Sequence, residues 1–241
     1  MTRSRLNLSA TRAETRLRSP VLRSLLALPL LVVVGLLTVG MARAAEPAAA
    51  SWVEGVNYKR LPVAIETRDP SKVEVVEVFS YACIHCKTFE PMISAWKAKA
   101  PAHVDFQRLP AAFDATWATL AQAYFTAEVL GVTDKVHDLI FSGIHDSRIN
   151  LADPAELARV FKDAAGIEPD QFNQTFQSFS VRSRVQQADA RTRAYRVTGT
   201  PTLIVDGRFL IDARMAGGND KMLEVVDHLV AEQWAQRAKP Q

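Results

Sequence analysis

The chain has 241 residues, of which 48% are hydrophobic and 23% charged, and its formal net charge is +3. This length and apolar content allow a full hydrophobic core, which excludes a mainly disordered protein. The first 44 residues hold seven arginines and one acidic residue, so the remaining chain carries 22 basic and 25 acidic residues, a net charge of −3. No sustained basic stripe survives there, and we therefore do not expect nucleic acid as a partner.

Residues 1–44 have the organisation of a secretory signal peptide. An Arg-rich stretch leads into the uncharged apolar run Ser24–Val39, and Ala42-Arg43-Ala44 places small residues where a signal peptidase reads them. The run has 16 residues, fewer than the roughly 20 that cross a bilayer, which favours cleavage over the alternative, a retained membrane anchor. In either case the basic flank predicts that the remaining chain lies in the oxidising bacterial periplasm.

The only two cysteines, Cys83 and Cys86, lie where a predicted strand meets a predicted helix. The valine-rich segment Lys72–Ser80 is typical of a central strand. Pro91 removes a backbone donor inside the following helix and is expected to kink it. A second strand at His103–Leu109 completes a strand-helix-strand unit, which predicts parallel pairing. Apolar residues at helical spacing mark the buried face of that helix: Phe89, Met92, Ile93 and Trp96.

From residue 113 to residue 197 the pattern is helical throughout. One helix in this block has a clear start, with Asp153 as N-cap, Pro154 at the first helical position and Glu156 as the reciprocal capping residue. The expected helices pass through 117–125, 136–140 and 153–166, through the aligned Phe172, Phe176 and Phe179, and through Val181–Tyr195.

Strand signals return after this helical block. Two strands are predicted at Pro201–Val205 and Arg208–Ile211, joined by a two-residue turn at Asp206-Gly207. A helix from Asn219 to about Ala235 follows. Because the strands on both sides of the block can share one sheet, the helices are predicted to be an insertion into a single α/β domain.

A Cys-x-x-Cys pair at the start of a helix has a chemistry of its own. The sulfur of Cys83 would lie near unpaired backbone N–H groups and the positive end of the helix dipole, which favours its thiolate. Cys86, one turn further along, would be more buried. His85 lies between them and could donate to the thiolate or place charge beside it. We therefore predict a redox-active Cys83–Cys86 disulfide in which Cys83 is attacked and Cys86 resolves the mixed disulfide.

Three other uses of the cysteines fit less well. A zinc site needs two further ligands, and there is no second cysteine pair. Covalent haem attachment needs a histidine directly after the second cysteine, where Lys87 stands. An inert disulfide would close too small a loop to stabilise the fold much. We therefore expect no metal and no bound cofactor. The five histidines are scattered without ligand spacing: His85, His103, His137, His145 and His228.

The segment Val197–Thr202 places Pro201 directly before a Leu-Ile-Val strand. Proline cannot donate to a sheet, so a proline at a strand start that follows Gly199 and Thr200 is a candidate for a cis peptide bond in a tight turn. Alone this signal is weak, and together with a Cys-x-x-Cys helix it becomes strong.

These motifs together resemble the thioredoxin fold, and specifically the DsbA-type disulfide oxidases. The likeness rests on Phe79–Cys86, on Pro91, on Gly199-Thr200-Pro201 before a strand-turn-strand, and on the helical insertion between them. It implies an α/β thioredoxin fold with an inserted helical subdomain. In that division residues 45–71 are an N-terminal linker and first strand, 72–112 and 198–241 the thioredoxin-like domain, and 113–197 the insertion.

Carried over by position, the resemblance implies roles for five residues. Cys83 would be the low-pKa nucleophile and Cys86 the resolving thiol, while His85 would be the motif histidine that stabilises the reduced form. Pro201 would be the cis-proline that faces the disulfide, and Thr200 before it would offer backbone hydrogen bonds to an extended substrate peptide.

Two acidic residues, Glu77 and Glu90, match positions near the active site that the family links to proton handling. An acid inside an apolar strand, such as Glu77, should have a raised pKa and be able to relay a proton. The alternative for Glu77 is a solvated side chain at a sheet edge.

The expected function is that of a monomeric periplasmic thiol:disulfide oxidoreductase that introduces disulfide bonds into exported proteins. The resemblance also implies reoxidation by a quinone-linked membrane partner of the DsbB type. One alternative is an isomerase or reductase with the same site, and another is a peptide-binding chaperone in which the cysteines are incidental. The family's usual dipeptide between the cysteines is Pro-His, whereas this chain has Ile84-His85, so the reduction potential stays open.

Overall fold

The computed structural model of the protein describes residues 52–238. The predicted signal peptide at 1–44, and with it the alternative of a retained anchor, lies outside the described residues. Within residues 52–238, no helix combines the length and the apolar character that crossing a bilayer requires.

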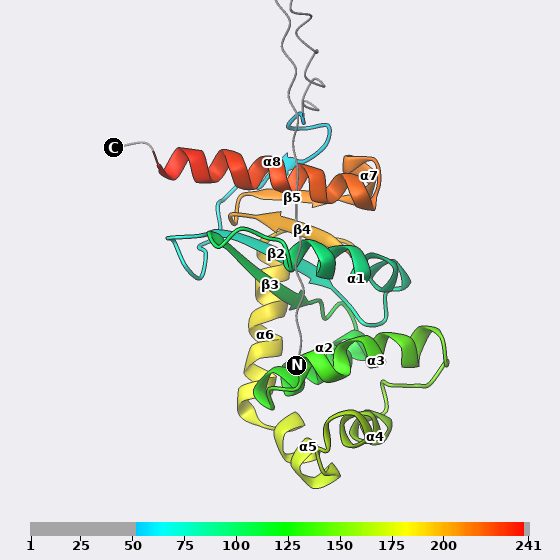
Figure 1. Cartoon of the computed structure of the whole chain (residues 1–241). Helices are drawn as coiled ribbons and strands as arrows, with labels where there is room; N and C mark the ends of the chain where they lie inside the picture. Colours follow the sequence, from blue (N-terminus) through cyan, green and yellow to red (C-terminus); the bar gives the residue numbers. More distant parts are fainter. Residues whose placement is uncertain (1–51, 239–241) are drawn as a thin grey trace, which may run out of the picture. The chain divides into compact units, whose positions relative to one another are not determined.

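A five-stranded mixed sheet occupies the centre of the described part, with the strand order β1-β5-β4-β2-β3 (Figure 1). β2 and β3 are parallel and the other neighbours are antiparallel. Every residue of β2 is buried, as expected for a central strand covered on both faces. The predicted strands and the parallel pairing are confirmed. The strands are β1 (Lys59–Arg60), β2 (Val73–Phe79), β3 (Val104–Pro110), β4 (Thr202–Val205) and β5 (Phe209–Asp212).

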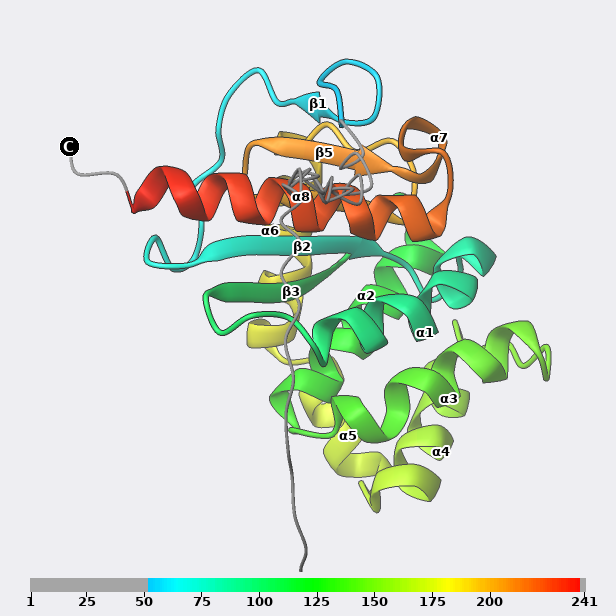
Figure 2. The ribbon, with the colours of Figure 1, turned by 45° about the horizontal axis from the view of Figure 1, so that its top comes forward.

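Five helices, α2 to α6, follow one another between β3 and β4, so the chain leaves the sheet and returns to it. α3 to α5 lie beyond the β3 edge of the sheet in both views (Figures 1 and 2). The fold is therefore a thioredoxin fold with inserted helices, as predicted. The helices are α1 (Ile84–Lys97), α2 (Ala115–Val129), α3 (Thr133–His145), α4 (Pro154–Ala165), α5 (Pro169–Phe176), α6 (Phe179–Ala194), α7 (Ala213–Ala216) and α8 (Asn219–Arg237).

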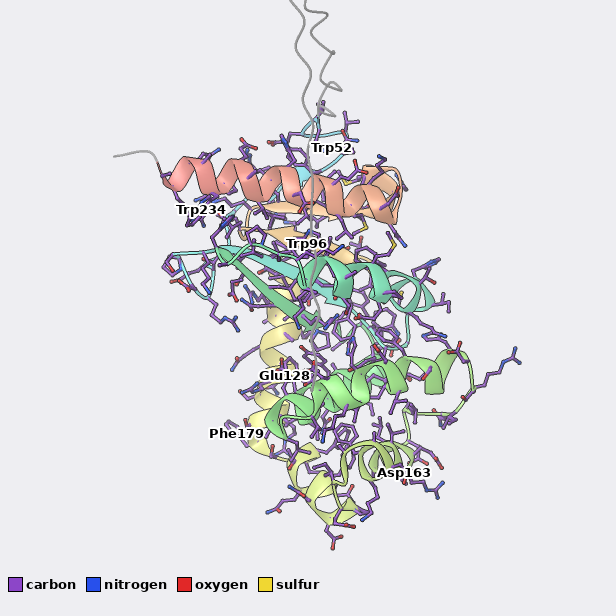
Figure 3. All side chains as sticks on the ribbon, in the orientation of Figure 1. Trp52, Trp96, Glu128, Asp163, Phe179 and Trp234 are labelled. Atoms are coloured by element: carbon purple, nitrogen blue, oxygen red, sulfur yellow. The ribbon has the colours of Figure 1, made fainter. Side chains whose placement is uncertain are left out.

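The two faces of the sheet have separate cores because side chains alternate along β2. Val73 and Val75 pack in one cluster with apolar residues of α1 and α8. Val76 and Val78 point to the opposite face and pack with the inserted helices. α1 and α8 are also joined by Trp96, labelled in Figure 3, whose indole N–H donates to Asp227 at 2.7 Å. The Cys-x-x-Cys segment lies where β2 passes into α1, and both cysteines belong to the cluster that packs with the inserted helices.

Phe179 differs from its predicted place on the same helix as Phe172 and Phe176. α5 ends at Phe176, and Phe179 is the first residue of α6, with its side chain 80% exposed (Figure 3). The reason is the Ser178 hydroxyl, which accepts from the Val181 N–H and caps a new helix.

The capping prediction for α4 is half right. Asp153 is the N-cap and its carboxylate accepts from the Ala155 N–H at 2.9 Å. Glu156 does not cap in return, because the Asp153 N–H already donates to the carbonyl of Asn150 at 3.1 Å. The Glu156 carboxylate binds Arg159 instead, at 2.7 Å.

The turn between β4 and β5 is one residue longer than predicted. Asp206 and Gly207 both have positive φ, and the Arg208 N–H closes the turn on the carbonyl of Val205 at 3.0 Å. Val205 nevertheless pairs with Phe209, which leaves Arg208 outside the ladder. The Arg208 carbonyl instead accepts from the N–H of Leu61 at 2.7 Å. The segment after β1 therefore supplies the hydrogen bond that a strand neighbour would otherwise give.

Candidate active site

Cys83 and Cys86 occupy the first turn of α1. Cys83 is the N-cap, with extended backbone angles, and its carbonyl accepts from the Lys87 N–H at 3.1 Å. Cys83 keeps 9% of its surface exposed, whereas Cys86 is fully buried. One thiol is therefore accessible to another molecule and the other lies behind it. Both are free thiols in this structure, so the Cys83–Cys86 disulfide stays a prediction.

The two thiols have opposite electrostatic surroundings. Hydrogen bonding from the Cys86 thiol, and then from Thr200 and the backbone N–H groups of Cys86 and His85, outweighs burial and lowers the pKa of Cys83 to about 5. Burial is the main cause that raises the pKa of Cys86 far above its ordinary value. At neutral pH Cys83 is thus a thiolate and Cys86 a protonated thiol, which is the form a nucleophile and a resolving thiol require.

The Thr200–Pro201 peptide bond is cis, and it lies directly against the cysteines. The Cys83 sulfur is 3.4 Å from the Thr200 carbonyl oxygen, although 117 positions separate the two residues. β4 begins at the next residue, Thr202, whose hydroxyl donates to the carbonyl of Gly199 at 2.8 Å and holds the loop. The structure therefore brings together the two motifs on which the sequence argument rests.

His85 is exposed at the mouth of the site. Its backbone N–H is among the groups that lower the pKa of Cys83. A role for its imidazole ring stays a prediction.

Glu77 lies on the buried face of β2 directly opposite Arg108 of β3. Its side chain has no exposed surface, so the alternative of a solvated edge position is wrong. The Arg108 Nε donates to one carboxylate oxygen of Glu77 at 3.1 Å, and the other oxygen, Oε1, is buried without a partner. Burial outweighs the attraction of Arg108 and raises the pKa of Glu77 to about 7.

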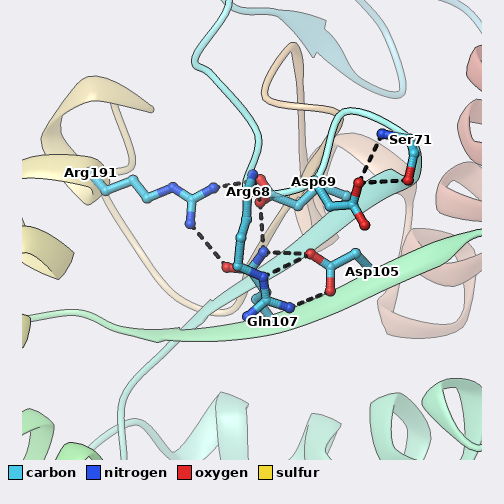
Figure 4. Close-up of polar contacts among 7 residues, drawn as sticks. Arg68, Asp69, Ser71, Asp105, Gln107 and Arg191 are labelled. Carbon is cyan, nitrogen blue, oxygen red and sulfur yellow. Dashed lines mark hydrogen bonds and ion pairs between the residues drawn. The ribbon is translucent and has the colours of Figure 1, made fainter.

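A second buried carboxylate on β2, Glu74, points to the opposite face and is fully bonded. One oxygen pairs with Arg191 of α6, and the other accepts from the Arg68 N–H at 3.1 Å and the Gln107 amide at 2.7 Å. Figure 4 shows Arg191 reaching toward this cluster, where Arg68 also binds Asp105. Of the two carboxylates on β2, only Glu77 keeps an oxygen without a hydrogen bond.

Glu90 joins this network from α1. Arg108 and the Ser94 hydroxyl both donate to Glu90, and the His137 Nε2 lies 3.1 Å from its second oxygen. His137 Nδ1 is in turn 2.8 Å from the Tyr81 hydroxyl. Because a carboxylate only accepts, Nε2 carries the proton and Nδ1 accepts from Tyr81. A continuous hydrogen-bonded chain therefore runs from Glu77 to a residue two positions before Cys83.

Two of the histidines that have no ligand spacing in the sequence thus belong to the site. Both lie on α3 and hold opposite ends of Tyr81: His137 binds its hydroxyl, and the His145 Nε2 donates to its carbonyl at 2.8 Å. Sequence reasoning missed both. Their separation of eight residues, two helical turns and a little more, is the only signal that could have placed them on one face.

Comparison with known proteins identifies the family. The model of the DSBA-like thioredoxin domain matches residues 74–230. A thiol:disulfide interchange protein DsbA of Azotobacter vinelandii is 40% identical over 179 residues, which cover 74% of this chain and 83% of the relative. This chain belongs to the DsbA-like thioredoxin family.

Solved DsbA structures agree with that assignment. The crystal structure of Pseudomonas aeruginosa DsbA superposes with a TM-score of 0.75 at 37% identity, over 78% of this chain and 97% of that one. DsbA of Xylella fastidiosa gives a TM-score of 0.71 at 35% identity, over 76% of this chain and 98% of that one. The predicted DsbA fold is confirmed.

One group of side chains beside this DsbA-type site has the composition of a metal site. Ligand atoms of Glu90, His137 and Asp138 lie within 4.8 Å of one another. Both ring nitrogens of His137 and both oxygens of Glu90 are already engaged with Tyr81, Arg108, Ser94 and each other. An ion bound there would have to break these bonds, so the group belongs to the hydrogen-bonded network of Glu90 and His137.

Proposed function

We propose that this DsbA-family protein introduces disulfide bonds into exported proteins by dithiol-disulfide exchange at Cys83 and Cys86. The observation that carries the proposal is the asymmetry of the two sulfurs. Cys83 is accessible and its pKa is lowered to about 5, whereas Cys86 is buried and its pKa is raised. A stable Cys83 thiolate is a good leaving group, and it stabilises the reduced form of the enzyme, so the disulfide form is a strong oxidant.

The reaction starts from the disulfide form. A substrate thiolate attacks the Cys83 sulfur, the S–S bond breaks, and Cys86 leaves with the electron pair and takes up a proton. The second substrate thiolate then attacks the substrate sulfur of the mixed disulfide and releases the Cys83 thiolate. The substrate has lost two electrons and gained a disulfide, and the enzyme has become a dithiol.

Three further residues would support this exchange. The Thr200 backbone beside the cis-Pro201 would bind an extended substrate strand next to Cys83, as its 3.4 Å contact with that sulfur suggests. Glu77, with a pKa of about 7, would take up and return the proton of Cys86 during the cycle. His85 would stabilise the reduced form.

The setting of the reaction is part of the same proposal. We place the protein in the periplasm as a monomer, delivered by the signal peptide at 1–44. Residues 72–112 and 198–241 would carry the reaction and residues 113–197 would form the insertion. A quinone-linked membrane partner of the DsbB type would restore the disulfide.

The redox equilibrium with glutathione tests the direction of the reaction. A potential near about −120 mV supports an oxidase, and one near about −270 mV would make the protein a thioredoxin-like reductant. Cys83→Ser and Cys86→Ser should each abolish oxidation of a reduced dithiol substrate, because neither variant can form the Cys83–Cys86 disulfide that accepts the two electrons. A cell in which Cys83→Ser leaves substrate disulfides intact would favour the chaperone alternative.

A further inference from the structure

A groove of about 540 Å³ opens beside the active site. The loop that carries Thr200 and the cis-Pro201 lines this groove, and so does His85 of the Cys-x-x-Cys motif. Since the Cys83 sulfur touches the Thr200 carbonyl, a peptide bound to that loop would extend into this groove. β1, β5 and the short α7 form the other side.

Three cationic side chains line the groove: Lys59 of β1, Arg196 before the cis-proline loop, and Arg214 of α7. All three are exposed, and none of them forms an ion pair with any residue in the range 52–238. The one carboxylate in the lining is Asp212, whose oxygen caps α7 by accepting from the Met215 N–H at 2.8 Å. With three cations against this one carboxylate, the groove lining keeps a net positive charge of two.

This charge is local, because the chain after residue 44 has a net charge of −3. Most other arginines of the described part are used in ion pairs, such as Arg68 with Asp105 and Arg184 with Glu128. The local charge around the groove is thus opposite in sign to the net charge of the chain after residue 44. The positive potential there can attract a negatively charged peptide.

The position of Arg196 is set by its backbone. Its φ is 56°, in the left-handed region that residues other than glycine rarely adopt. Its N–H is bonded to the carbonyl of Arg193 at 2.9 Å, so the end of α6 fixes this backbone and directs the exposed side chain to the groove.

We propose that this groove selects substrate segments that carry acidic side chains next to the cysteine to be oxidised. Carboxylates of the bound strand would pair with Lys59, Arg196 and Arg214 while the strand bonds to the Thr200 loop. The proposal rests on the proposed function and adds a preference among substrates. Steering by such a groove acts mainly on the rate of encounter.

The test uses dithiol peptides that are identical except at the residues flanking the cysteines, which are Glu, Gln or Lys. The rate constant for oxidation of each peptide by the full disulfide-form protein is measured, and its intrinsic thiol reactivity with a small neutral disulfide is divided out. We expect the Glu peptide to react about tenfold faster than the Gln peptide, and the Lys peptide more slowly than both. The Glu advantage should shrink in 1 M salt, where the screening length is only about 3 Å.

A charge-neutral variant locates the effect. Lys59→Gln, Arg196→Asn and Arg214→Gln together should bring the rate constant of the Glu peptide to that of the Gln peptide. Asparagine is chosen at Arg196 because it tolerates a positive φ.

The matched control removes the same number of charges elsewhere: Lys99→Gln, Lys135→Gln and Arg148→Asn, all exposed and outside the groove, with Arg148 also at a φ of 56°. It should keep the full preference for the Glu peptide. Equal rates for all three peptides with the wild-type protein would overturn the inference and leave the proposed function standing. Failure to oxidise any peptide would instead count against the proposed function. Loss of the preference in the control as well as in the groove variant would assign it to net charge and overturn the role of the groove.

Discussion

Glu77 meets Arg108 through only one of its two carboxylate oxygens. The ion pair spans 3.1 Å between Oε2 and the Arg108 Nε, and Oε1 is left buried without a hydrogen bond. The pKa of Glu77 is consequently raised from 4.5 to about 7, with burial as the main cause. The folded protein therefore binds one proton more than the unfolded chain between these two pH values.

Because of this extra bound proton, we expect the free energy of unfolding to depend on pH. Below pH 4.5 the carboxyl is protonated in both states, and ionisation above that pH costs more in the folded state, so the free energy of unfolding should fall by about 3 kcal/mol up to pH 7 and above. Glu77→Gln should abolish this fall. Denaturant unfolding of both proteins at pH 4.5 and pH 8 measures it. Glu74→Gln is the control, because it breaks a bonded pair on the other face and should destabilise at both pH values. Parallel losses in wild type and Glu77→Gln would contradict the assignment.

The lowered pKa of Cys83 predicts a reactive thiolate in acid. Alkylation by iodoacetamide should reach half its maximal rate near pH 5, with modification confined to Cys83 because Cys86 is buried and protonated. The sign also follows for stability: a depressed pKa stabilises the folded dithiol form above the unfolded value of 9.0 and loses this effect as the pH falls through about 5. The dithiol form should therefore gain unfolding free energy relative to Cys83→Ser as the pH rises from about 5 to 9.0. A midpoint near pH 9 would refute the active-site electrostatics.

The bond between Tyr81 and His137 predicts a coupling between the insertion and the active-site segment. Tyr81→Phe removes a buried hydroxyl from His137 Nδ1, at a distance of 2.8 Å, and should cost about 1 kcal/mol of unfolding free energy. A double-mutant cycle with His137→Ala should show that the two losses are not additive. Strict additivity would mean that the two side chains act independently.

Gly207 predicts a large local effect from a single methyl group. Its φ is +60°, and a Cβ there would lie 2.0 Å from the carbonyl oxygen of Ile65. Gly207→Ala should therefore destabilise the protein by more than about 1 kcal/mol. Gly199→Ala, where nothing lies within 4 Å and φ is not positive, should change the melting temperature little. Similar shifts for both variants would argue against the clash.

The sequence was sufficient for the parts of the site that have local signatures. A few neighbouring residues are enough to recognise the valine-rich strand before Cys83. The same holds for the proline that precedes the strand after it. The pairing of β2 with β3 followed from the crossover rule. Phe179 was misplaced because a serine cap outweighed a three-residue apolar spacing.

The parts that sequence reasoning missed depend on contacts between distant segments. His145 reaches the Tyr81 carbonyl across 64 positions, and His137 reaches Glu90 across 47. Nothing in the chain near either histidine reports which backbone or carboxylate it will meet. The groove cations were missed for the same reason, because Lys59, Arg196 and Arg214 come from three separate segments of the chain.

The contact between Cys83 and Thr200 also bears on how the protein is made. Under the export proposed above, the chain would cross the membrane N-terminus first, and α1 with both cysteines would emerge before the segment 117 positions later. Until that last part arrives, the sheet lacks β4 and Cys83 lacks the carbonyl that flanks it. The contribution of Thr200 to the lowered pKa of Cys83 would be missing until the final strands dock. A newly exported molecule would then be open to thiol exchange before its active site is complete.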